Sequence, residues 1–138
     1  MKLPKINATE LPYSKEDLRG LLRRHTKKHE DCLCMCPVTG NSIEMLIRFV
    51  AVELGEPYIS QRKLNTCIKL LTELLSKQCF VKSRLVMASA IVYIAGIKIG
   101  ERLTQTTIGK MFYVAPVSVR FYKELVRMLP HPMRFMEV

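Results

Sequence analysis

From residue 42 onward, apolar residues recur every three or four positions, the spacing that places them on one face of an α-helix. Serine is a favoured helix-capping residue, so we expect one helix to begin at Ser42 and a second at Ser60. Gly55 and Pro57 lie between the two and are residues that end helices. The expected core-facing residues are Ile43, Leu46, Ile47, Val50, Ala51 and Leu54 in the first helix, and Leu64, Cys67, Ile68, Leu71, Leu74 and Leu75 in the second.

A third segment, residues 83 to 99, is apolar on every side; Ser83 is expected to cap it and Gly100 to end it. A helix without a polar face belongs at the centre of a helical bundle. The pattern therefore predicts an all-α fold with this helix in the middle. The helix before it is expected to have a basic outer surface, formed by Arg62, Lys63, Lys69 and Lys77.

Residues 103 to 129 are expected to form a helix-turn-helix. Thr104 would cap its first helix, and Pro116 suits the first position of the second, because the proline has no N–H to leave unpaired there. Gly109 is the small residue expected where the helices cross. Tyr113 occupies a turn position where glycine is common, and a bulky residue resists a positive φ angle, so this turn is expected to differ from the usual one. The face expected to be buried consists of Ile108, Phe112, Val114, Val119 and Tyr122.

The other face of this pair carries short or basic side chains near the start of the second helix, where a recognition helix meets DNA. Arg120 is the one long cation in its first turns, and an arginine there can reach the O6 and N7 acceptors of guanine. Lys110 and Lys123 are placed to contact phosphates. The predicted DNA-binding residues are Lys110, Val117, Ser118, Arg120, Lys123 and Arg127.

Residues 1 to 41 are expected to stand apart from a helical domain over residues 42 to 138. Residues 1 to 12 are predicted to form an extended or mobile arm. Ser14 and Asp17 then have the spacing of a capping box, which predicts the start of a basic amphipathic helix. We expect this helix to dock on the domain because its leucines need a surface on which to be buried: Leu18, Leu21 and Leu22.

A segment rich in histidine and cysteine follows this helix. His25 and His29 are four residues apart and so share a helix face, and the cysteines follow within seven residues. Such side chains are soft ligands for zinc, and no other cofactor is expected. The alternative is a reduced, cysteine-rich connection, because C-x-C-x-C is not the C-x-x-C knuckle of structural zinc sites. The candidate metal ligands are His25, His29, Cys32, Cys34 and Cys36.

The net charge of +10 lies in the second half of the chain. Residues 62 to 134 hold thirteen Lys and Arg against three acids, whereas residues 1 to 61 hold nine basic and eight acidic residues. Clustered cations favour a polyanionic partner such as double-stranded DNA. A solvated basic surface that keeps the protein soluble is the alternative.

No run of 18 apolar residues and no apolar signal core occur in the sequence, so we expect no membrane span and a cytoplasmic, nucleoid-associated protein with reduced or metal-bound cysteines. An enzyme is the weakest functional class. The chain has no Ser/His/Asp order, no glycine-rich phosphate loop and no acid pair in an apolar setting, and no small-molecule substrate is expected.

Four segments together resemble the cyclin-like repeat of archaeal transcription factor B, the counterpart of eukaryotic TFIIB. They are IRFVAVELG (47–55), ASAIVYIAGIKIG (88–100), RLTQTTIGKMF (102–112) and VSVRFYKEL (117–125). The resemblance implies a five-helix cyclin-like box ending in a helix-turn-helix that binds promoter DNA beside TATA-binding protein. The family has two repeats and a zinc ribbon of C-x-x-C knuckles, whereas this chain has room for one repeat and no such ribbon. The resemblance therefore implies a specialised paralogue or a mobile-element regulator.

Three functions remain open from the sequence. The first is a DNA-binding module in transcription initiation or its regulation, favoured by the helix-turn-helix and the basic second half. The second is a cyclin-box module that binds a protein without reading DNA, because a fold does not fix a function. The third is a metal-responsive regulator that uses the His/Cys segment.

Overall fold

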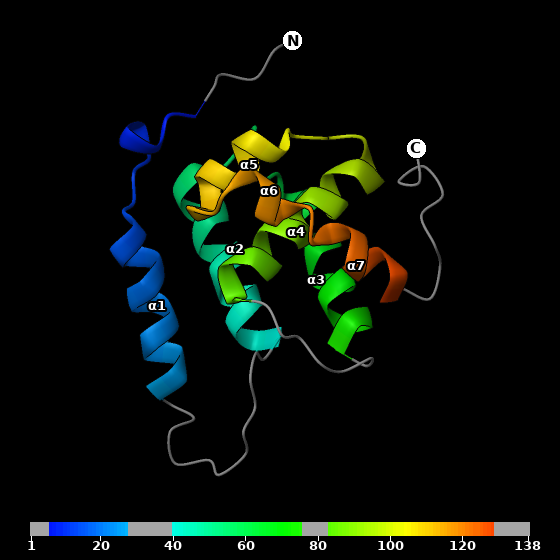
Figure 1. Cartoon of the computed structure of the whole chain (residues 1–138), viewed down its shortest axis with the longest axis horizontal. Helices are drawn as coiled ribbons and strands as arrows, with labels where there is room; N and C mark the ends of the chain where they lie inside the picture. Colours follow the sequence, from blue (N-terminus) through cyan, green and yellow to red (C-terminus); the bar gives the residue numbers. More distant parts are fainter. Residues whose placement is uncertain (1–5, 28–39, 76–82, 129–138) are drawn as a thin grey trace.

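Helix α4 (Arg84–Ile99) lies at the centre of the computed structural model, which describes residues 6–27, 40–75 and 83–128 (Figure 1). These residues contain no strand, so the all-α prediction is confirmed. Nor does any helix within these ranges have the length and apolarity needed to cross a membrane. The other elements are η1 (Ala8–Glu10), α1 (Lys15–Lys27), α2 (Gly40–Leu54), α3 (Gln61–Leu75), α5 (Gln105–Phe112), α6 (Pro116–Val119) and α7 (Tyr122–Met128).

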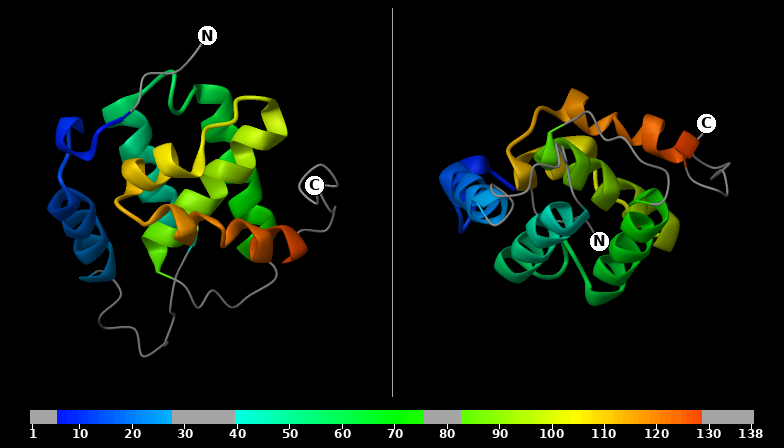
Figure 2. Two further views of the ribbon diagram at one scale, coloured as in Figure 1. Left: turned by 45° about the horizontal axis from the view of Figure 1, so that its top comes forward. Right: turned by 90° about the horizontal axis from the view of Figure 1, so that it is seen from below.

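The central position of α4 follows from its sequence. Every residue from Met87 to Gly96 is buried, and α4 packs against helices on both sides. Figure 2 shows α2 and α3 on one side of α4 and α5, α6 and α7 on the other. The Val86 N–H donates to Ser83 Oγ at 3.2 Å, and Gly100 ends the helix with φ 78°, so both predicted ends are confirmed.

Of the two serine caps predicted for the first two helices of the domain, one is confirmed. The Lys63 N–H donates to Ser60 Oγ at 3.1 Å, which confirms the cap of α3. The predicted cap at Ser42 is wrong, because α2 begins at Gly40 and Ser42 is a buried residue of its first turn. A serine cap contributes only about 1 kcal/mol, so burial of the first turn can move a helix start by two residues.

The N-terminal segment packs against the helical domain. Ser14 and Asp17 form the predicted capping box, with reciprocal bonds of 2.8 Å and 3.2 Å between each backbone N–H and the other side chain. Leu18 is fully buried, and Leu21 and Leu22 pack half-buried against the core. The described part of the predicted arm is not extended: it contains η1, and Ile6 is buried in the common core.

Lys63 corrects the prediction of a basic outer surface on α3. It is 1% exposed, and its Nζ donates to the Tyr58 carbonyl at 3.0 Å. Burial lowers the pKa of Lys63, an effect opposed by Glu101 and Cys67. Lys63 lies one helical turn before the core residue Cys67, so its long stem fills a core-facing position while its ammonium group caps a carbonyl. Arg62 and Lys69 are exposed as predicted, and Lys77 lies outside the described residues.

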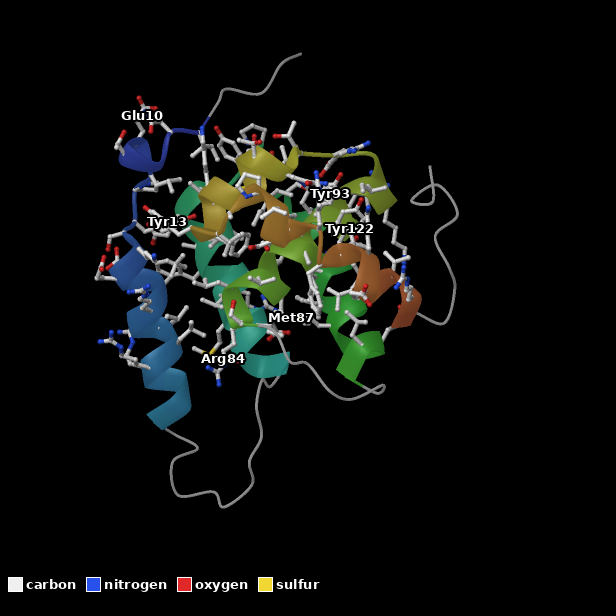
Figure 3. The ribbon with its side chains drawn as sticks, in the orientation of Figure 1. Glu10, Tyr13, Arg84, Met87, Tyr93 and Tyr122 are labelled. Atoms are coloured by element: carbon white, nitrogen blue, oxygen red, sulfur yellow. The ribbon has the colours of Figure 1, made fainter. Side chains whose placement is uncertain are left out.

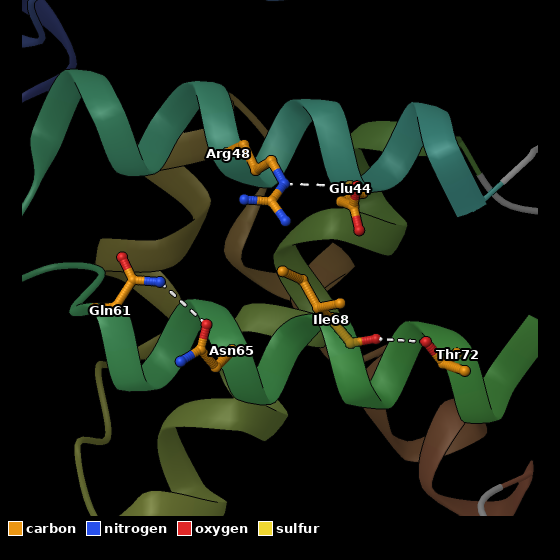
Figure 4. A network of polar contacts seen from close by, with 6 residues as sticks. All are labelled: Glu44, Arg48, Gln61, Asn65, Ile68 and Thr72. Atoms are coloured by element: carbon orange, nitrogen blue, oxygen red, sulfur yellow. Dashed lines mark hydrogen bonds and ion pairs between the residues drawn. The ribbon is translucent and has the colours of Figure 1, made fainter.

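The outward faces of α2 and α3 carry short-range polar contacts (Figure 4). Arg48 Nε lies 3.5 Å from Glu44 Oε2, and Gln61 donates to Asn65 at 3.0 Å. The Thr72 hydroxyl donates to the Ile68 carbonyl at 3.0 Å within α3. An exposed i,i+4 ion pair contributes only about 0.3–0.5 kcal/mol, so removing Arg48 should leave the fold intact.

Cys67 is a core residue, as the sequence predicts, and its burial has a consequence for stability. It is 0% exposed, and burial raises the pKa of its thiol from 9.0 to about 12, although nearby Lys63 opposes the shift. Above pH 9.0 the unfolded thiol ionises while the folded thiol keeps its proton. The unfolded state then binds fewer protons, and the free energy of unfolding falls as pH rises.

We therefore predict that Cys67→Ala weakens the alkaline loss of stability. Above the pKa of the unfolded thiol, Cys67 should lower the free energy of unfolding by up to about 1.4 kcal/mol for each pH unit. Urea unfolding of the wild type and the variant at roughly pH 8 to 10 measures this difference. The cavity left by the substitution shifts the whole curve of the variant equally at every pH. Parallel curves would therefore contradict the buried, protonated thiol.

Candidate nucleic-acid interface

The α5–α6 pair has the close crossing that the sequence predicts. The Thr107 N–H donates to Thr104 Oγ1 at 3.1 Å, which confirms the cap of α5. A Cβ atom at Gly109 would lie 2.7 Å from the Val114 carbonyl oxygen, closer than real Cβ contacts come. The Val114 N–H also donates to the Gly109 carbonyl at 2.8 Å. Only glycine therefore fits the crossing without a backbone shift.

Tyr113 takes the left-handed conformation after α5, with φ 54° and ψ 41°. The expectation that a bulky residue would avoid a positive φ here is wrong. The Tyr113 hydroxyl donates to the Tyr13 carbonyl at 2.7 Å, and the Tyr13 hydroxyl donates to the Met111 carbonyl. The two rings meet edge to face with centroids 6.0 Å apart. These contacts offset the strain of the turn and tie it to the N-terminal segment (Figure 3).

The predicted buried face of the pair is largely as expected. Ile108, Phe112 and Val119 are 0% exposed, and Tyr122 is 9% exposed. Val114 is only half-buried, because it belongs to the turn itself. The core therefore holds α5 and α6 against α4 and leaves their other face toward solvent.

The predicted second helix is broken. It was expected to continue from Pro116 to about residue 129, but α6 ends at Val119 and α7 begins at Tyr122. In the break, the Arg120 and Phe121 N–H groups donate to carbonyls three residues back, at 3.2 Å and 3.1 Å. These i→i+3 bonds form a single 3₁₀ turn that joins α6 to α7. Val119 before the turn and Tyr122 and Leu125 after it are all buried in the core.

The structure brings three of the predicted DNA-binding residues together on α6 and the turn after it. Val117 is 64% exposed, Ser118 is half-buried and Arg120 is exposed. We call these three residues the α6 face. Val117 and Ser118 lie on the one-turn helix α6, Arg120 follows its last residue, and Val119 between them is buried in the core. A short apolar side chain, a hydroxyl and a guanidinium group are side chains that contact base edges and phosphates.

The three predicted lysine and arginine contacts lie on the neighbouring helices. Lys110 is half-buried on α5, whereas Lys123 and Arg127 are exposed on α7. Arg127 Nη1 lies 3.3 Å from Glu124 Oε1, and both side chains are more than half exposed. Such an exposed pair is weak, so Arg127 remains able to exchange Glu124 for another anion.

No protein-family model, curated protein or solved structure matches the chain. The resemblance to a transcription factor B repeat thus stays a prediction based on sequence motifs. The role proposed for the α6 face therefore rests on its geometry and charge.

One cluster beside this surface has no counterpart in the sequence-based prediction. Arg102 Nη2 donates to the Tyr93 hydroxyl at 2.9 Å, and the Tyr93 and Tyr122 rings lie 4.6 Å apart. Figure 3 shows the two tyrosines side by side where α4 meets α7. We call Arg102, Tyr93 and Tyr122 the Arg–Tyr cluster. No local spacing marks it, because its members come from α4, the loop before α5 and α7.

The predicted metal site falls almost entirely outside the described residues. His29, Cys32, Cys34 and Cys36 are not described, and of His25 only the backbone, within α1, is described. Among residues 6–27, 40–75 and 83–128, no group of three or more His, Cys, Asp or Glu side chains is placed to hold a metal ion. Zinc binding by the five predicted ligands stays a prediction.

Proposed function

We propose that this protein is a DNA-binding transcription factor module that resembles a single cyclin-like repeat of transcription factor B. In this proposal α5 and α6 form a helix-turn-helix, and α6 enters the major groove of double-stranded DNA. TATA-binding protein or another transcription component is the protein partner that the resemblance implies. The regulation or initiation of transcription at a promoter is the expected role.

The observation that carries the proposal is the α6 face: Val117 and Arg120 are exposed and Ser118 is half-buried, whereas Val119 on the other side is buried. Lys123 and Arg127 are exposed on the neighbouring helix α7, and residues 62 to 134 carry an excess of basic residues. This charge favours a polyanion, because each phosphate neutralised releases counterions. The break after Val119 shortens α6 to one turn, which carries Val117 and Ser118, and Arg120 follows this turn directly.

Arg120→Ala and Lys110→Ala test this role. A preferred duplex is first selected from a random library with the wild-type protein, and affinities for it and for random duplex are then measured across salt concentrations. We expect Arg120→Ala to weaken the binding free energy by about 1–3 kcal/mol on the selected duplex and by much less on random duplex, because a guanine contact carries sequence information. Lys110→Ala should weaken binding to both duplexes by the same factor. It should also reduce the salt slope, that is, the slope of log affinity against log salt concentration, by about one unit, as the loss of a phosphate contact does.

Arg48→Ala is the matched control, because it removes the same charge from α2, on the far side of α4 (Figure 2). Equal losses for Arg120→Ala on both duplexes would reduce Arg120 to a phosphate contact. An unchanged affinity for both test variants, with circular dichroism like the wild type, would contradict DNA reading by α6. The cyclin-box protein-interaction function would then be favoured.

A further inference from the structure

Arg102 is an exposed cation whose position is fixed by its neighbours. Its Nη2 donates to the Tyr93 hydroxyl at 2.9 Å, and its guanidinium carbon lies 5.7 Å from the centre of the Tyr93 ring. Tyr93 itself is 2% exposed and therefore rigid. Arginine has five N–H donors, so most remain free for an anion. A guanidinium group held in place loses less conformational entropy when it binds.

No acidic side chain within the described residues neutralises this cation. The salt bridges there involve Arg48 and Arg127, and none involves Arg102 or Arg120. The adjacent carboxylate, Glu101, is occupied elsewhere, because its Oε2 accepts a hydrogen bond from the Ser60 hydroxyl at 2.7 Å. Arg102 is thus a cation without an ion-pair partner among the described residues, and the Tyr93 ring covers one side of it.

A cavity of about 360 Å³ lies next to Arg102 and is lined by Tyr93, Arg102, Leu103, Thr104 and Gln105. It is large enough for a phosphate group, and it lies at the N-terminus of α5, the positive end of the helix dipole. When two such helices dock on DNA, the first helix crosses the sugar–phosphate backbone. The start of α5 is where a backbone phosphate would lie.

We propose that Arg102, positioned by Tyr93, forms a phosphate-binding site that holds one phosphate of the DNA backbone at the start of α5. The proposal deepens the proposed function and rests on it for the source of the phosphate. It adds Arg102 to the interface as a residue that positions the protein on DNA. Because phosphate contacts carry no sequence information, Arg102 should contribute equally on every duplex.

Arg102→Ala and Arg102→Lys are compared with Arg48→Ala on the selected and the random duplex, across salt concentrations. We expect Arg102→Ala to lose affinity by the same factor on both duplexes and to reduce the salt slope by about 0.9, the value of one phosphate contact. Arg102→Lys should keep the slope and recover part of the affinity, since it keeps the charge but not the planar fork. Melting temperatures equal to that of the wild type verify the fold. Affinities and slopes like those of Arg48→Ala would overturn the site.

A second measurement separates this proposal from DNA binding as such. Inorganic phosphate is titrated into the wild type and Arg102→Ala while the arginine Nε–H signals are followed by nuclear magnetic resonance. A shift of the Arg102 signal in the wild type, with the remaining arginine signals unchanged in Arg102→Ala, would support the phosphate site. If the wild type gives this shift but binds no duplex, the proposed function fails and the phosphate comes from a small molecule. No shift would overturn the phosphate site, whether or not duplex DNA is bound.

Discussion

Leu18→Ala is expected to lower the free energy of unfolding by about 2–5 kcal/mol, the usual cost of removing a buried leucine side chain. Leu18 is 0% exposed although it belongs to α1, and it packs in the same core as the residues of α2 and α4. The loss should be this large only if α1 is docked in solution. Urea unfolding followed by circular dichroism measures it.

Arg19→Ala is the matched control for this prediction. Arg19 is the next residue of α1 and is exposed, so its removal should change stability by less than about 0.5 kcal/mol. Equal effects of the two substitutions would mean that α1 does not pack on the domain. The contacts between Tyr13 and Tyr113 would then also be absent, because Tyr13 lies just before α1 and packs together with it.

Gly109→Ala is expected to destabilise the protein by about 1–3 kcal/mol, as overpacking does. Alanine normally favours a helix over glycine, so the expected sign is opposite to that of helix propensity. The reason is the backbone oxygen of Val114, 2.7 Å from the position of the new Cβ atom, with Pro116 N at 3.4 Å. The chain between α5 and α6 must move to accept the methyl group.

Gly20→Ala is expected to have the opposite effect on stability. Gly20 lies within α1, and a Cβ atom there would have no neighbour within 4 Å. That substitution should stabilise the protein by about 0.5–1 kcal/mol. Chemical denaturation of both variants tests the pair, and a stabilised Gly109→Ala would contradict the close crossing. A displaced α6 should also reduce discrimination between selected and random duplex, since the α6 face would shift with it.

The turn between α5 and α6 links stability to the candidate interface. Its left-handed residue, Tyr113, donates to the Tyr13 carbonyl, so the conformation just before α6 depends on the N-terminal segment. Tyr13 in turn packs against Phe49 of α2, with ring centroids 5.5 Å apart. The orientation of the α6 face is therefore set by contacts nearly one hundred residues away in sequence.

The sequence by itself determined the features whose causes are local. The caps at Ser60, Ser83 and Thr104, the capping box at Ser14, and the helix end at Gly100 each depend on hydrogen bonds or φ angles within a few residues. The apolar surface of α4 likewise predicted its central place, because a helix without a polar face must be covered on all sides.

Only the tertiary structure decided the features that depend on distant partners. Lys63 is buried because the Tyr58 carbonyl accepts a hydrogen bond from its ammonium group, and Tyr113 tolerates a positive φ because Tyr13 packs against it. The helix breaks beside Arg120 at a 3₁₀ turn that the residue pattern did not predict, and the Arg–Tyr cluster joins segments that no periodicity relates. Local energies of about 1 kcal/mol set preferences along the chain, whereas burying a large side chain contributes about 1.5–3 kcal/mol and overrides them.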